Sequence, residues 1–60
     1  MFVSFDCIAN ATSFGNALDE IGVEYTCHMR GPRIIFVVSG QDDEVRDLVD
    51  EHGGTIAVSG

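Results

Sequence analysis

The sequence of 60 residues contains no lysine and no tryptophan, and it has only one proline, two cysteines and three basic residues, all of them arginines. Without lysine, chemistry that depends on a lysine amine is excluded. Two cysteines are too few for a disulfide framework. The first residues lack the basic and apolar segments of a secretion signal. We therefore expect a cytoplasmic protein whose two thiols stay free in a reducing compartment.

Long hydrophobic runs are also missing. No apolar stretch approaches the roughly 18 residues of a membrane helix, so the sequence predicts no membrane span. Hydrophobic residues nevertheless make up 45% of the chain, which is typical of a folded protein rather than a disordered one. The length predicts one domain over residues 1–60, and a domain of this size buries only about 60% of the surface that its unfolded chain exposes. A deep cleft between domains is thereby excluded.

The charge balance is strongly acidic. Ten aspartates and glutamates face the three arginines, and the net charge is −7. Such a surface repels phosphate backbones and anionic membranes, so we expect no direct binding to nucleic acid or membrane. It attracts a basic partner protein, because complementary fields speed and orient association. The alternative is that the charge serves solubility, for example in a cytosol rich in salt.

Apolar periodicity and breaker residues divide the chain into six expected elements. Capping residues from Asn10 to Ser13 precede a helical stripe that ends at Gly22, in the position of a left-handed cap. Ser39 and Asp42 have the spacing of a capping box before a second stripe. The expected elements are strands over residues 2–8, 23–29, 34–38 and 55–59, a helix over residues 13–21, and a second helix from about Asp42 to the glycines at 53 and 54.

The order β-α-β-β-α-β predicts an α+β ferredoxin-like, split βαβ fold. Right-handed crossovers would place both helices on one face of a four-stranded antiparallel sheet, with the first and third strands in its centre. These are the two most apolar strands. A shift of the sequence by 31 residues also brings Phe5 onto Phe36 and Gly22 onto Gly53. This pattern predicts two similar halves.

Strand alternation assigns each strand residue to one face of the sheet. Cys7 and Cys27 fall on the helix-covered face, so we expect two buried thiols about 10 Å apart or more, too far to pair. The helix-covered face is expected to hold Val3, Phe5, Cys7, Tyr25, Cys27, Met29, Ile34, Phe36, Val38, Ile56 and Val58.

The opposite face would then have an apolar centre made of Phe2, Ile8, Ile35 and Val37. A patch of this kind favours self-association into a homodimer or coverage by a partner. The alternative is that these are ordinary scattered surface residues.

Motifs for catalysis or metal binding are not found. Cys27 and His28 are adjacent, so on a strand their side chains leave opposite faces and cannot act together. His52 is expected at a helix end, where a protonated imidazole suits the helix dipole. Phe2 is the only aromatic residue on the open face, which disfavours an RNA-binding sheet. We therefore predict no enzyme, no cofactor and no metal site.

The second helix carries the most distinctive pattern. Val45, Leu48 and Val49 form its expected buried side, which leaves the carboxylates to the exposed side. A row of carboxylates on a rigid helix resembles a row of nucleic-acid phosphates. This pattern predicts a small acidic inhibitor that blocks the basic surface of a nucleic-acid-binding protein, as phage-encoded inhibitors such as anti-CRISPR proteins do as a class. The expected partner-binding residues are Asp43, Glu44, Asp47, Asp50 and Glu51.

An alternative follows from topology. The same element order, with a helical stripe running into Gly22 and Val23, resembles small amino-acid-sensing regulatory domains of the ACT type. This resemblance covers the whole chain and implies a homodimer that pairs through strands or helices and holds a small ligand at the interface. Residues 10–12 would then form the loop that faces the ligand.

Overall fold

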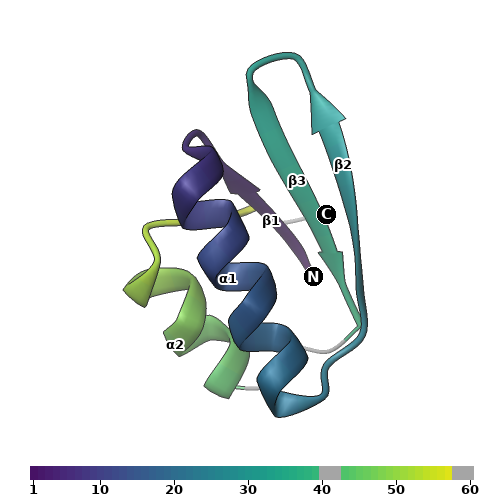
Figure 1. Ribbon diagram of the computed structural model, residues 1–60, viewed down its shortest axis with the longest axis vertical. Helices are drawn as coiled ribbons and strands as arrows, with labels where there is room; N and C mark the ends of the chain where they lie inside the picture. Colours follow the sequence, from purple (N-terminus) through teal and green to yellow (C-terminus); the bar gives the residue numbers. More distant parts are fainter. Residues whose placement is uncertain (40–42, 58–60) are drawn as a thin grey trace.

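The computed structural model describes residues 1–39 and 43–57, and its elements follow the expected order (Figure 1). The strands form one antiparallel sheet in the order β2-β3-β1-β4, which confirms the α+β ferredoxin-like arrangement. In the described part of the chain, no helix is long and apolar enough to cross a membrane. The elements are β1 (Phe2–Phe5), α1 (Ile8–Ile21), β2 (Tyr25–Arg30), β3 (Arg33–Val38), α2 (Asp43–Glu51) and β4 (Thr55–Ala57).

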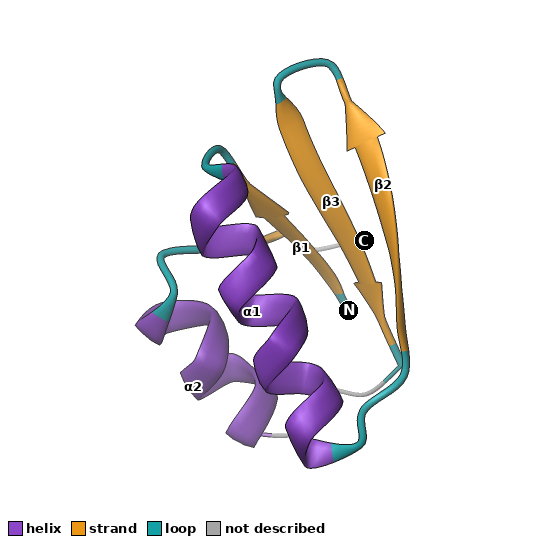
Figure 2. Ribbon diagram, in the orientation of Figure 1, coloured by secondary structure: helices purple, strands orange, loops and turns teal. Residues whose placement is uncertain are grey.

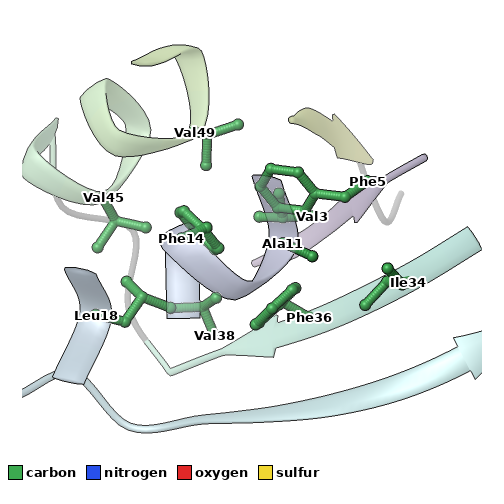
Figure 3. Packing of buried hydrophobic residues seen from close by; sticks show 10 residues of the cluster. All are labelled: Val3, Phe5, Ala11, Phe14, Leu18, Ile34, Phe36, Val38, Val45 and Val49. Atoms are coloured by element: carbon green, nitrogen blue, oxygen red, sulfur yellow. The ribbon is translucent and has the colours of Figure 1, made fainter. Parts of the chain in front are cut away.

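Both helices pack against the same face of the sheet (Figure 2). Alternate residues of β1 and β3 point toward the helices and form one buried cluster with the inner sides of α1 and α2 (Figure 3). This pattern is that expected from strand alternation and helical spacing. The cluster consists of Val3, Phe5, Ala11, Phe14, Leu18, Ile34, Phe36, Val38, Val45 and Val49.

Phe14 lies at the centre of this core and has no exposed surface. Its ring centroid lies 5.0 Å from that of Phe5 and 5.2 Å from that of Phe36. The Phe14 and Phe36 rings meet edge to face, which is a favoured aromatic geometry. The three rings therefore join α1 to the two central strands.

The two helices end in the same way, 31 residues apart. Gly22 and Gly53 both have a φ of 75°, a left-handed value that suits glycine. The Val23 N–H donates to the Leu18 carbonyl at 3.0 Å, and the Gly54 N–H donates to the Val49 carbonyl at 2.9 Å. These are the hydrogen bonds of a Schellman motif. The predicted likeness of the two halves therefore extends to their helix caps.

The first strand is shorter and the first helix longer than predicted. β1 ends at Phe5, Cys7 occupies the N-cap position without a side-chain hydrogen bond, and α1 begins at Ile8. The apolar Ile8 suits the predicted strand over residues 2–8. A helix that begins at Ile8 instead places Ala11 on the side of α1 that faces the core, where it is only 3% exposed. This burial, together with the high helix propensity of alanine, favours the helix over the strand.

The prediction that both cysteines are buried is wrong, because both are exposed free thiols. Cys7 lies at the start of α1 rather than in β1. Cys27 does share its face with the helices, since it pairs with the buried Phe36. However, β2 is the edge strand, and the hairpin of β2 and β3 projects beyond the helices (Figure 1). The helices therefore do not cover the edge strand β2, and most of its helix-facing side chains are exposed to solvent.

Two expectations fall partly outside the described residues. The predicted capping box needs Asp42, which lies in the segment 40–42. Its first member, Ser39, donates its side-chain hydroxyl to the Glu24 carbonyl at 3.0 Å. The predicted last strand includes Val58 and Ser59, whereas the described part of β4 is Thr55–Ala57.

Candidate interaction surfaces

The carboxylates of α2 form a continuous acidic surface on its outer side. Val45 and Val49 hold the helix in the core, and the five predicted partner-binding acids are all exposed. With a helical rise of about 1.5 Å per residue, Asp43, Asp47 and Glu51 follow one another at about 6 Å along the axis. Among the described residues, none of these carboxylates forms an ion pair.

The position of these acids is favourable at the start of the helix and unfavourable at its end. Asp43 and Glu44 lie in the first turn, where the helix dipole favours negative charge. The last turn contains Asp50 and Glu51 but no basic residue, so negative charge meets the negative end of the dipole. Asp47 and Glu51 are also like charges at a spacing of four residues, which is destabilising. Helix stability alone therefore does not account for this row.

The open face of the sheet carries three of the four predicted apolar residues. Phe2 lies opposite Val37, and Ile35 follows on the same face two residues earlier in β3. Phe2 is 42% exposed, whereas Ile35 and Val37 are half-buried. Ile8 does not belong to this patch, because it lies in α1 on the other side of the sheet. The patch is therefore smaller than predicted.

A second apolar surface lies between α1 and β2. Here α1 and the sheet enclose a groove of about 330 Å³. Two of the residues lining it are the most exposed of the large apolar side chains in the described part of the chain, since Ile8 is 69% exposed and Met29 64% exposed. The exposed Cys27 lies beside them. The residues lining the groove are Ile8, Ala11, Thr12, Gly15, Asn16, Tyr25, Cys27, Met29, Ile34 and Phe36.

Tyr25 is one of the residues that line this groove. Its pKa is raised, first because the ring is partly buried and then because the Asp19 carboxylate lies nearby. Gly15 allows α1 to approach, since a Cβ at this position would lie 3.1 Å from the Tyr25 hydroxyl. The phenol therefore stays neutral and acts in packing and polar contact.

Two of the three arginines lie at the tip of the β2–β3 hairpin. Arg30 and Arg33 are paired across the two strands. The Nε atom of Arg33 lies 3.7 Å from a carboxylate oxygen of Asp6, which is the one ion pair among the described residues. The third arginine, Arg46, is exposed on α2 among the five carboxylates of that helix, so α2 is predominantly but not exclusively acidic.

The described residues hold no cluster of metal-ligating side chains. Cys27 and His28 lie in β2 and point to opposite faces, as predicted. The His28 ring makes a hydrogen-bond contact of 3.2 Å with the Thr26 hydroxyl. His52 is half-buried near the end of α2, with its ring centroid 6.2 Å from that of Phe14. No three metal-ligating side chains converge within residues 1–39 and 43–57.

Comparisons with known proteins add no relative. No family model matches the chain, and neither the curated proteins nor the solved structures gave a match. The function must therefore be argued from the surfaces of this chain.

Proposed function

We propose that this protein is a non-enzymatic binding protein that places the acidic side of α2 on a basic surface of a partner protein and blocks it. The observation that carries this proposal is the row of exposed carboxylates that continues to the last turn of α2, where it lowers helix stability. Charge retained at a cost in stability is typical of a site selected for binding.

The chemistry of the row favours a nucleic-acid-binding protein as the partner. Carboxylates at regular spacing on a rigid helix present an acceptor-rich negative surface, which suits the arginines and lysines that otherwise hold phosphates. Burial of Val45 and Val49 fixes the helix to the core, so little ordering is needed on binding. We place this interaction in the cytoplasm, where the exposed thiols of Cys7 and Cys27 remain reduced.

The test is capture of the partner from a lysate of the native host with charge-reversal variants. We expect a basic nucleic-acid-binding protein to be retained by the wild-type protein and released as the salt concentration rises, because salt screens exposed charges. The double variant Asp43→Lys with Asp47→Lys should not retain it. Glu20→Lys, an exposed charge reversal on α1, should retain it. Equal retention by the double variant would remove the role of α2.

A second candidate function is a regulatory domain that binds a small ligand. The groove between α1 and β2 favours it, since its volume of about 330 Å³ is within the range of small-molecule sites. Residues 10–12, expected as the ligand-facing loop, instead lie inside α1. A rise in melting temperature with one member of a panel of free amino acids would favour this function over the first.

A further inference from the structure

We infer that the free edge of β2 pairs with β2 of a second copy of this chain, in an antiparallel register centred on Cys27. β2 ends the sheet formed by the described residues, so one side of its backbone has no strand beside it. Natural edge strands are usually protected by lysine, proline, a bulge or short length. β2 has six residues, and it contains neither lysine nor proline.

The existing hydrogen bonds show which backbone groups of β2 are available. The Ser39 N–H donates to the Glu24 carbonyl at 3.0 Å, so Glu24 directs its backbone groups toward β3. The Val38 N–H instead donates to the Met1 carbonyl at 2.8 Å, on the β1 side. Since Val38 is the partner of Tyr25, that pair does not bond. Backbone groups alternate along an antiparallel strand, so those that point away from the sheet belong to Tyr25, Cys27 and Met29.

One symmetric register pairs all three of these residues with each other. With the twofold axis at Cys27, Tyr25 lies opposite Met29 of the second copy, and Cys27 lies opposite its own counterpart. Each of these pairs has its free N–H and C=O groups in the bonding position. A shift by two residues in either direction leaves one of the three without a partner in β2. A shift by one residue places opposed side chains on different faces of the sheet.

The same register also matches the side chains. Glu24 lies opposite Arg30 of the second copy, so opposite charges meet twice across the axis. Tyr25 and Met29 form an aromatic–sulfur pair on the groove side. Ile8, which is 69% exposed beside Met29, would lie next to the joined grooves. The net charge of −7 does not prevent this contact, because α2 and β2 lie at opposite sides of the molecule (Figure 1).

The first test uses the two thiols as probes. Opposed residues of a bonded antiparallel pair have Cα atoms about 5.5 Å apart, within the range of a disulfide. Diamide takes two electrons and two protons from a pair of thiols and joins them. We expect Cys7→Ser, which keeps Cys27, to form a covalent dimer rapidly, and Cys27→Ser, which keeps Cys7, to form none. The difference should vanish in denaturant. Equal or absent cross-linking of the two native variants would overturn the register.

The second test measures the noncovalent dimer by sedimentation of the reduced protein across the micromolar range. Glu24→Arg should raise the dimer Kd about tenfold, because the new arginine would face Arg30 of the second copy. This repulsion would occur twice, once on each side of the twofold axis. Arg30→Glu should do the same by opposing two glutamates. The double variant should restore the wild-type Kd. A wild-type protein that stays monomeric throughout would overturn the inference. A dimer Kd that is the same in all three variants as in the wild-type protein would place the contact elsewhere.

Discussion

Gly54 shows how closely single residues are fitted in this small core. An added Cβ at Gly54 would lie 2.6 Å from the Cζ atom of Phe5 and 2.9 Å from its Cε2 atom. Phe5 cannot move away easily, because it is 1% exposed and its ring contacts those of Phe14 and Phe36. The glycine is thus required by packing, in contrast to Gly53, whose left-handed φ requires it.

We predict that Gly54→Ala lowers the free energy of unfolding by about 1–3 kcal/mol, as overpacking of a filled core does. Urea denaturation of the purified variant measures this change. In a Phe5→Leu background the same substitution should cost less, because a smaller side chain leaves room for the methyl group. An equal cost in both backgrounds would mean that Phe5 is not the source of the penalty.

At the scale of the element, the side of α2 that faces the core was predicted correctly, whereas the carboxylates on its outer side do not all stabilise the helix. Val45 and Val49 are buried as expected from their spacing, and Leu48 and His52 are half-buried beside them. The helix dipole favours negative charge at the N-terminal end of α2 and disfavours it at the C-terminal end. Equal substitutions at the two ends should therefore have opposite effects.

We predict that Glu51→Lys stabilises the protein by about 0.5–1 kcal/mol, because it suits the C-terminal end of the dipole and forms a favourable pair with Asp47. Glu44→Lys makes the same change in net charge in the first turn and should destabilise by about 0.3–1 kcal/mol. Thermal or urea unfolding of both variants measures the contrast. Stabilisation by both substitutions would show that relief of the overall negative charge outweighs the position of the charge in the helix.

The strands and helices could be predicted from the sequence to different extents. The helix-facing positions of β1 and β3 and the Gly22 cap follow from alternation and turn residues, which are local signals. The strand order follows from the order of the elements and the right-handed crossover rule. The start of α1 could not be predicted, because Ile8 suits a strand as well as a helix and only burial of Ala11 decides between them. The alanines at positions 9 and 11 were the available signal for a helix at this point.

The groove between α1 and β2 was missed for a different reason. Alternation correctly placed Cys27 and Met29 on the helix-facing side of β2. It could not show that two helices would cover the central strands and leave the edge strand bare. How many strands the helices cover depends on tertiary packing. The alternation of apolar residues in an edge strand therefore does not show whether those residues are buried. The acidic side of α2, in contrast, could be predicted because core spacing fixes the outer side of a helix.

At the scale of the whole molecule, two surfaces lie on opposite sides. The edge strand β2 and the helix α2 lie at opposite sides of the molecule (Figure 1). A dimer formed through β2 would leave both copies of α2 exposed and would present two acidic surfaces to a partner. If the partner offers two basic sites at a matching distance, the second contact becomes intramolecular and the overall affinity increases.

If the acidic side of α2 binds a basic partner, its charges should control the rate of association with that partner. Stopped-flow mixing with the captured partner should show a rate constant for the wild-type protein that decreases steeply as the salt concentration rises. Asp47→Lys should reduce this rate constant strongly at low salt and flatten its salt dependence, whereas Glu20→Lys, with the same change in net charge, should leave the rate close to wild type. Equal rates for Asp47→Lys and Glu20→Lys at every salt concentration would contradict the claim and leave the row of carboxylates as a solvated surface.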